Sequence, residues 1–480
     1  MKKWTLFTTV LALMLLTASP PSADAATPKV VDVQTTGTYT YMFKGDESVW
    51  QFGYRISVPT RLELPQTAKK IVSNSNYDTI VLFEDGSVWR YPSDVWGDAS
   101  QEPAPIAGLS DIVDLEAGRT HTLALKADGT VWGWGTNFHG ELGNGQVKEA
   151  WDIPPQQVVG LKDVQAIAAG DNSLALTKQG EVYTWGGWAH ASRVTADNPQ
   201  GFRVTPVKVN NLPKITAVDM AGDTSLALDA DGKVHTWGDN FLQLKSPNGD
   251  SSTLAAPAQI PGIDNVKAIA LADRALFLKE DGSVYIAGID YARSGELTDA
   301  QKKQQLQPQL IPSLTGVTRI DAAASQLFAI DGKGELYGWG NNNSGSLGNG
   351  SLYWKSQLND PTRVLDTGTV VIDGKRQDYP GVIHQGVTMV PLRKLAEPLG
   401  ATLGFEAQTK QVTISYGGQT VALKPGDASV TVNGKPLQLA GPIRIYNDET
   451  HVPLRFISEL FGAQVSWNAD LAEITVTTAK

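Results

Sequence analysis

The stretch ADGTVWGWGTNFHGELGNG, residues 127–145, poses the question that decides the fold, because it holds six glycines, two tryptophans, a histidine and a glutamate. A dinucleotide-binding loop needs the pattern G-x-G-x-x-G at the start of a helix that follows a strand. Here Phe138 stands where the third glycine would be, and no helical pattern follows it. The glycines therefore do not predict a phosphate site, and architecture is the better interpretation.

The same motif recurs along the chain, which explains it. A turn is followed by Val or Leu and then by an aromatic residue or histidine in seven copies. That residue is Trp50, Trp89, Trp132, Tyr183, His235, Tyr285 or Tyr337, with spacings between 39 and 52 residues. A period near fifty residues indicates an array of similar supersecondary units.

Each unit is predicted to be β. In residues 122–135, apolar residues alternate on both sides of Asp128-Gly129, which is a hairpin signal because glycine accepts positive φ. An upstream strand ends in small residues such as Ala117-Gly118, which suit sheets that converge on one axis. Four strands per unit and seven units predict a mainly β chain with a seven-bladed β-propeller. Six blades remain the alternative, because the first two repeats lack the L-G-x-G tail.

The repeats resemble a known family. AGRTHTLALKADGTVWGWGTNFHGELGNG (117–145) and GELYGWGNNNSGSLGNG (334–350) are similar to the regulator-of-chromosome-condensation repeat, and the resemblance covers roughly residues 30–365. It implies that His121 fills a structural histidine position and that Glu141 replaces a usual glutamine. The nuclear nucleotide-exchange role of that family is not expected here, because this chain is acidic and predicted to be exported.

A second pattern begins after Asp366. Residues 388–414 and 450–476 repeat each other at an offset of 62, each with VPLR, a glycine and an aromatic strand. Pro391 and Pro453 suit the first turn of a helix, where no amide hydrogen bond is lost. The chain therefore predicts a small duplicated α+β domain after the propeller.

This second unit, over about residues 366–480, resembles the copper amine oxidase N-terminal stalk-like domain. The resemblance implies no oxidase activity, because in the oxidases this domain is an appendage without copper. Asn76-Tyr77-Asp78 matches the motif of the quinone cofactor, but the six histidines include no H-x-H pair for copper. We therefore expect no cofactor, no metal site and no catalytic residue. Arg393 and Arg455 are expected to pair with Glu397, Glu459 or backbone, and binding of an anionic wall polymer is the alternative.

The beginning of the chain predicts export. Residues 1–25 combine Lys2 and Lys3, an apolar core and an A-x-A site, as in a signal peptide cut before Ala26. The predicted domains are then the propeller at 26–365 and the stalk-like domain at 366–480, each expected to fold alone. The chain has no cysteine and a net charge of −10, which argues against a disulfide framework, nucleic acid and anionic membrane. No later run is long enough to span a bilayer.

Two sets of loop residues form the predicted binding face of the propeller. The charged set is Arg119, Asp171, Asp223 and Arg274, and the aromatic set is Phe138, Trp188, Phe241 and Tyr291. Aromatic and arginine side chains on a loop rim suit an interface hot spot, although the aromatics could instead only pack between blades.

These observations predict a monomeric, non-catalytic protein that is secreted or bound to the cell wall of a Gram-positive type bacterium. Its propeller would dock an extracellular protein or a cell-wall glycan, with the C-terminal domain as a tether or spacer. One alternative is an inhibitor or regulator of a secreted enzyme, as in the exported β-lactamase-inhibitory propeller that the repeat resembles. A polysaccharide-active enzyme has the least support.

Overall fold

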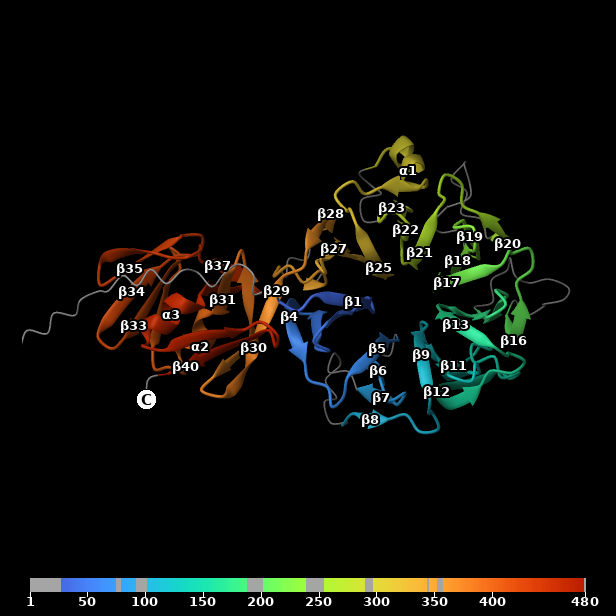
Figure 1. Ribbon diagram of the computed structural model, residues 1–480, viewed down its shortest axis with the longest axis horizontal. Helices are drawn as coiled ribbons and strands as arrows, with labels where there is room; N and C mark the ends of the chain where they lie inside the picture. The colour runs from blue at the N-terminus through green and yellow to red at the C-terminus, as the bar shows by residue number, and fades with distance from the viewer. Residues whose placement is uncertain are drawn as a thin grey trace, which may run out of the picture.

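The structure is a computed structural model that describes residues 27–74, 79–91, 102–187, 202–238, 254–289, 297–342, 345–351 and 357–478. Seven four-stranded antiparallel sheets follow one another along the chain and surround one central axis (Figure 1). The fold is thus the predicted seven-bladed β-propeller. The first two repeats, which have the weakest sequence motifs, form complete blades, so the six-bladed alternative is wrong.

The strands of each blade are consecutive in sequence. Blade 1 is β1 (Val30–Thr35), β2 (Tyr39–Lys44), β3 (Val49–Gly53) and β4 (Ile56–Leu62). Blade 2 is β5 (Ala68–Ser73), β6 (Thr79–Phe83), β7 (Val88–Tyr91) and β8 (Ala104–Pro105). Blade 3 is β9 (Ile112–Ala117), β10 (His121–Lys126), β11 (Val131–Asn137) and β12 (Lys148–Gln157). Blade 4 is β13 (Val164–Ala169), β14 (Asn172–Thr177), β15 (Val182–Gly186) and β16 (Arg203–Lys208).

The remaining three blades repeat this order. Blade 5 is β17 (Ile215–Ala221), β18 (Thr224–Asp229), β19 (Val234–Gly238) and β20 (Leu254–Gln259). Blade 6 is β21 (Val266–Leu271), β22 (Ala275–Lys279), β23 (Val284–Ala287) and β24 (Gln309–Leu310), with α1 (Asp299–Gln305) between its last two strands. Blade 7 is β25 (Val317–Ala323), β26 (Gln326–Asp331), β27 (Leu336–Asn341) and β28 (Gln357–Arg363).

The motif quoted above forms the second hairpin of blade 3. Gly129 has φ +82°, and the Asp128 carboxylate accepts the backbone N–H of Thr130 at 2.9 Å, so the turn fixes the β10–β11 register. Asp85 and Asp281 accept the same bond from the residue two positions on in blades 2 and 6. A short acceptor followed by glycine is therefore a turn signal that the blades share.

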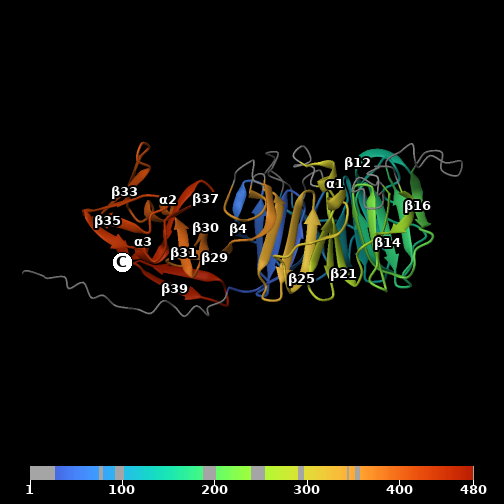
Figure 2. The same ribbon diagram turned by 90° about the horizontal axis from the view of Figure 1, so that it is seen from above.

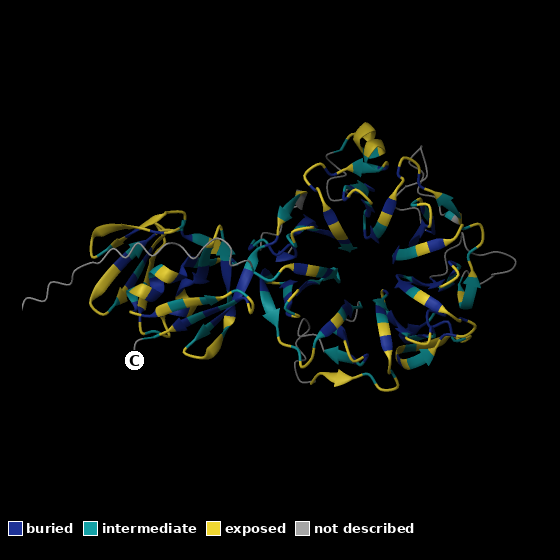
Figure 3. Cartoon of the chain, in the orientation of Figure 1, coloured by how far each residue is buried: buried dark blue, intermediate teal, exposed yellow. Residues whose placement is uncertain are grey.

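Neighbouring blades are held together by hydrophobic clusters that lie between their middle strands. Between blades 3 and 4, for example, Leu123 and Val131 pack with Val164 and Trp185. Corresponding clusters fill the other interfaces, and Figure 3 shows buried residues concentrated within the blades and exposed residues in the turns. The core of the ring is thus a set of separate interfaces, one for each pair of adjacent blades.

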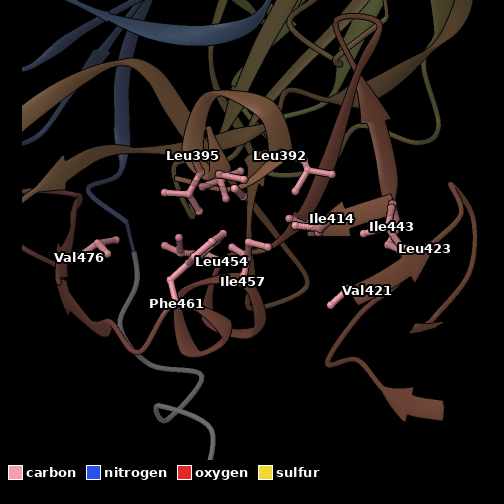
Figure 4. Close-up of a cluster of buried hydrophobic side chains, with 14 of the residues drawn as sticks. Leu392, Leu395, Ile414, Val421, Leu423, Ile443, Leu454, Ile457, Phe461 and Val476 are labelled. Carbon is pink, nitrogen blue, oxygen red and sulfur yellow. The ribbon is translucent and has the colours of Figure 1, made fainter. Parts of the chain in front are cut away.

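The C-terminal unit has two sheets and two short helices. The seven-stranded sheet contains β29 (Asp366–Ile372), β30 (Lys375–His384), β31 (Val387–Pro391), β37 (Arg444–Tyr446), β38 (Glu449–Pro453), β39 (Gln464–Asn468) and β40 (Glu473–Thr477). The five-stranded sheet contains β32 (Thr402–Glu406), β33 (Gln411–Tyr416), β34 (Gln419–Leu423), β35 (Ser429–Val432) and β36 (Lys435–Gln438). The helices are α2 (Leu392–Ala396) and α3 (Leu454–Leu460). Side chains from both helices and both sheets form one core, seen in Figure 4.

The duplicated segments form the expected helix and hairpin units, with one difference at the prolines. Pro391 and Pro453 end strands and occupy the N-cap positions of α2 and α3, so each helix begins one residue later than expected. Their φ values of −61° and −56° suit both the strand end and the helix entry. Arg393 pairs with Glu397 at 3.7 Å, as the sequence predicted.

Candidate functional site: the loop face of the propeller

Antiparallel pairing places the described members of both predicted loop sets on one face of the ring. In each blade the innermost strand runs toward this face, the second strand runs away and the third returns. The residues after the first strand, such as Arg119, therefore lie at the same end as those after the third, such as Phe138. We call this end the loop face. Figure 2 shows the ring edge-on with α1, which also follows a third strand, at this face.

The charged set lies on the turns that follow the innermost strands, close to the central axis of the ring. The backbone N–H of Arg119 donates to the carbonyl of Gly170 in the next blade at 2.9 Å, and Asp171 donates to Gly222 at 2.8 Å. A Cβ atom on Gly118 would lie 2.5 Å from the Gly170 oxygen, so the blades touch here through backbone. This contact is the physical reason for the small residues that end the inner strands.

The members of the charged set differ in exposure. Arg119 is exposed and Asp171 is half-buried, whereas Asp223 is only 7% exposed. The Arg274 side chain is also largely buried and lies 3.9 Å from the Asp273 carboxylate. The structure thus brings all four residues to one face in adjacent blades, and Arg119 offers the most surface to a partner.

Of the aromatic set, Phe138 alone can be placed, because Trp188, Phe241 and Tyr291 fall outside the described residues. Phe138 packs edge-to-face against Trp151, with ring centroids 5.0 Å apart. Trp151 is 68% exposed, a large exposure for an aromatic side chain. We call Phe138 and Trp151 the aromatic platform.

Trp151 was not predicted, and a strand bulge explains its position. Gly135 pairs with Ile153, and Asn137 pairs with Lys148, so β12 uses five residues where β11 uses two. The extra residues of β12 loop outward and carry Trp151 to the surface. Asp152 in the same bulge pairs with Arg90 of blade 2 at 3.2 Å. The sequence signal that could have indicated this bulge was the length of the segment at residues 146–157.

The other side of the blade 3 loop is fixed to blade 4. The Glu141 carboxylate accepts the backbone N–H of His139 at 2.8 Å and lies 3.2 Å from its Nδ1. The His139 ring packs edge-to-face against Phe202, with centroids 5.7 Å apart. The loop that carries Phe138 is therefore anchored at both sides, which preorganises the aromatic platform.

His121 and Ser173 form a buried pair that looks like the start of a catalytic arrangement. Ser173 Oγ donates to the Glu141 carbonyl at 3.0 Å, so His121 Nε2, 2.8 Å away, must donate to Ser173. The imidazole therefore cannot accept the serine proton, as a general base would have to. Burial lowers the pKa of His121 to about 4, and the side chain is 1% exposed. With Trp185 Nε1 also donating to Glu141, the group fastens blade 3 to blade 4.

Carboxylates on the inner strands link neighbouring blades through hydrogen bonds to backbone N–H groups. Asp219 accepts the backbone N–H of Leu271 at 2.7 Å, and Asp321 accepts that of Thr35 at 2.6 Å. Burial raises the pKa of Asp219 to about 8, with the charge of Glu116 adding to it. Burial also raises the pKa of Asp321 to about 7. Within the described part of the chain, no cluster of His, Cys, Asp or Glu could hold a metal ion.

The fold and the loop face define the class of this protein, which is a β-propeller built from sequence repeats. Comparisons with known proteins identify the family within that class. The model of the RCC1-like domain matches residues 93–377, more than half of the chain, and so the chain belongs to the RCC1-like domain family. The copper amine oxidase N-terminal domain matches residues 371–476. Both predicted resemblances are confirmed.

Individual relatives match over part of their length. The RCC1-like G exchanging factor-like protein of Mus musculus is 32% identical over 276 residues, 52% of this chain and 59% of that protein. The ultraviolet-B receptor UVR8 of Arabidopsis thaliana is 27% identical over 50% of this chain and 56% of its own length. This chain therefore spans less than two thirds of these relatives.

Solved structures agree on the fold. Human WBSCR16 superimposes with a TM-score of 0.55 at 26% identity, covering 65% of this chain and 85% of that one. Yeast RCC1 (Prp20) in complex with Kap60 gives 0.54 at 20% identity, covering 71% and 84%. Among the described residues, no helix has the length and apolar character needed to cross a lipid bilayer.

Proposed function

We propose that this chain is a non-catalytic binding protein that docks a protein partner on the loop face of blade 3. The observation that carries the proposal is the aromatic platform, in which Trp151 stands 68% exposed on a bulge and is supported by Phe138. RCC1-like propeller proteins typically bind proteins or act as exchange factors, which favours a protein as the ligand.

The surroundings of Trp151 suit a protein interface. Lys148, Glu149 and Asp152 give the bulge both signs of charge around an apolar centre. An aromatic anchor inside a mixed polar rim is the usual anatomy of a protein interface. A nucleic acid fits poorly, because the chain carries a net charge of −10.

The buried chemistry supports binding over catalysis. The His121–Ser173 pair is hydrogen-bonded in the direction opposite to nucleophile activation and is closed to substrate. The raised-pKa carboxyls of Asp219 and Asp321 are engaged by backbone N–H groups of the next blade. Each of these groups has a structural task between blades.

We also propose that the protein acts outside the cell, secreted or attached to the cell wall. The support is the leader-like pattern of residues 1–25, which lies outside the described residues. N-terminal sequencing of the exported protein should begin at Ala26. Retention of the leader in protein recovered from the cytoplasm would contradict the proposal.

The platform is tested with Phe138→Ala/Trp151→Ala in the full chain. The control is Phe405→Ala, because Phe405 is a similarly exposed aromatic, at 64%, on the C-terminal domain. Each protein is immobilised and presented with the secreted-protein fraction and, separately, with purified wall polysaccharide of the source organism. The partner recovered is purified, and its Kd is measured.

We expect one protein partner that binds the wild type and the control equally and binds the double variant at least about tenfold more weakly, since an interface anchor contributes on the order of 2 kcal/mol. Equal binding by the double variant would remove the platform from the interface. Binding to the polysaccharide alone would show that the ligand is a glycan.

A further inference from the structure

The ring has one interface that the chain does not close covalently, between blade 7 and blade 1. All four strands of blade 1 come from residues 30–62, and all four of blade 7 from residues 317–363. In the described structure these two sheets exchange no strand. Blades 1 and 7 are therefore joined by side-chain and turn contacts, whereas every other pair of neighbouring blades is also connected by the chain.

The direct contacts across this seam include an apolar cluster, in which Phe52 of blade 1 and Phe328 of blade 7 pack edge-to-face with ring centroids 5.9 Å apart. The backbone N–H of Val30 donates to Gly334 at 3.2 Å, and that of Thr35 donates to the Asp321 carboxylate. Arg319 pairs with Asp32 at 2.5 Å. Because the two sheets share no strand, non-covalent contacts alone hold blade 1 against blade 7.

The C-terminal domain reaches the seam at a first point, the turn that ends at Ala472. Ala472 is fully buried in a cluster that contains Phe52 of blade 1 and Phe328 of blade 7. Trp467, on the strand before this turn, packs against the same cluster. The hydrophobic core of the seam is thus shared by three bodies, the two terminal blades and the C-terminal domain.

The second point is the turn between β37 and β38. Gly350 of blade 7 donates its N–H to Ser57 of blade 1 at 2.8 Å, and Asn447 of the turn donates its N–H to the Gly350 carbonyl at 2.9 Å. Ser57 Oγ also donates to Asn447 Oδ1 at 3.2 Å. Tyr446 packs with Val58 of blade 1. Residues from both terminal blades and from the C-terminal domain therefore meet in one hydrogen-bonded group.

The domain cannot swing away on a linker. β28 ends at Arg363 and β29 begins at Asp366, so two residues connect the propeller to the second sheet. Val364, one of these two, is itself buried in the seam cluster. Lys44 of blade 1 is buried against the domain and donates to the Thr367 carbonyl at 3.3 Å.

We propose that the C-terminal domain is the clasp of the propeller: its two turns, at residues 446–448 and 469–472, hold blade 7 against blade 1 in place of a shared strand. This assigns the domain a function within the chain, which differs from the tether or spacer that the sequence predicted. It does not depend on the identity of the partner at the loop face.

The duplication inside the domain supplies a test of the turn at residues 469–472. Lys410 occupies the position that matches Ala472 at the offset of 62, has a similar backbone conformation (φ +57° against +45°) and is exposed. The variant Ala472→Lys therefore places in the turn at 469–472 a residue that the corresponding turn at 407–410 already accepts. Lys410→Ala is its matched control, since no residue of the turn at 407–410 belongs to the seam cluster.

The repeat inside the propeller supplies a test of the turn at residues 446–448, through its contact residue Gly350 in blade 7. Gly350 and Gly145 occupy the same motif position, with φ +81° and +83°. A Cβ on Gly350 would collide with the Tyr446 ring, whereas the nearest atom to a Cβ on Gly145 is 3.8 Å away, in Thr205. Gly350→Asn should therefore push Tyr446 and its turn away from blade 7. Gly145→Asn should cause no such displacement, and asparagine tolerates the positive φ at both positions.

Amide hydrogen exchange of the full chain reads the outcome blade by blade. We expect Ala472→Lys and Gly350→Asn to speed exchange at least about tenfold in β1, β2, β26 and β27, with blades 3–5 and strand β33 of the domain unchanged. Both controls should match the wild type. Unchanged exchange in blades 1 and 7 in both test variants, or equal acceleration in all blades, would overturn the clasp.

Discussion

Replacement of Gly170 by alanine tests the contact that sets the spacing of the blades. A Cβ on Gly170 would lie 2.7 Å from Met220 Cγ and closer still to the Gly222 carbonyl oxygen. The carbonyl belongs to the backbone of blade 5 and cannot rotate away. Blades 4 and 5 must therefore separate at the ends of their inner strands, where Asp171 N–H donates to the same Gly222 oxygen.

The cost follows from overpacking of a tight interface, which is typically about 1–3 kcal/mol, and the rigid backbone on one side places this case near 3 kcal/mol. A propeller of roughly 330 residues has an unfolding entropy of about 0.7 kcal/mol per kelvin, so the Tm should fall by about 4 °C. Tryptophan fluorescence during thermal unfolding measures the shift, because Trp185 lies in the neighbouring interface.

Gly332→Ala is the control for this substitution. Gly332 is exposed on the opposite face, has no positive φ, and the nearest atom to its added Cβ is 3.6 Å away. Its Tm should stay level or rise slightly, because alanine restricts the unfolded chain. A wild-type Tm for Gly170→Ala, or an equal fall for both variants, would refute the argument that close backbone contact requires glycine here.

Three further outcomes follow from buried or exposed side chains. Asp219 has a pKa raised from 3.8 to about 8, so between these pH values the folded protein keeps a proton that the unfolded chain has lost. Its contribution to stability should therefore fall as the pH rises from about 4 to about 8, and urea unfolding of Asp219→Asn should show a weaker fall. His121 has a pKa lowered from 6.5 to about 4, so its stabilisation is present above pH 6.5 and is lost, by roughly 3 kcal/mol, as pH falls toward 4. His121→Gln, which keeps a donor for Ser173, should flatten this acid limb, and an unchanged limb would contradict the assignment. Trp151→Ala should lower the stability measured in urea by about 1 kcal/mol or less, because the side chain is mostly exposed, and a larger loss would show a packing role.

Local signals in the sequence determined the repeated part of this protein. The turn at Asp128-Gly129, the alternation of apolar residues and the small residues at the ends of inner strands each act within one unit of about fifty residues. They therefore predicted seven blades, the order of strands and the two loop sets on one face. The internal duplication at an offset of 62 predicted the helix and hairpin units of the second domain in the same way.

Contacts between distant segments were decided only by the tertiary structure. The outward position of Trp151 depends on the register between β11 and β12, which the strand residues alone do not fix. The duplicated turns are nearly the same locally, yet Ala472 is buried in the seam of the ring and Lys410 is exposed. Ser57 and Asn447 meet across almost the whole chain. Periodicity reports which face of an element is apolar, whereas the partner of that face is set by how all the elements close into one ring, and no local pattern carries that information.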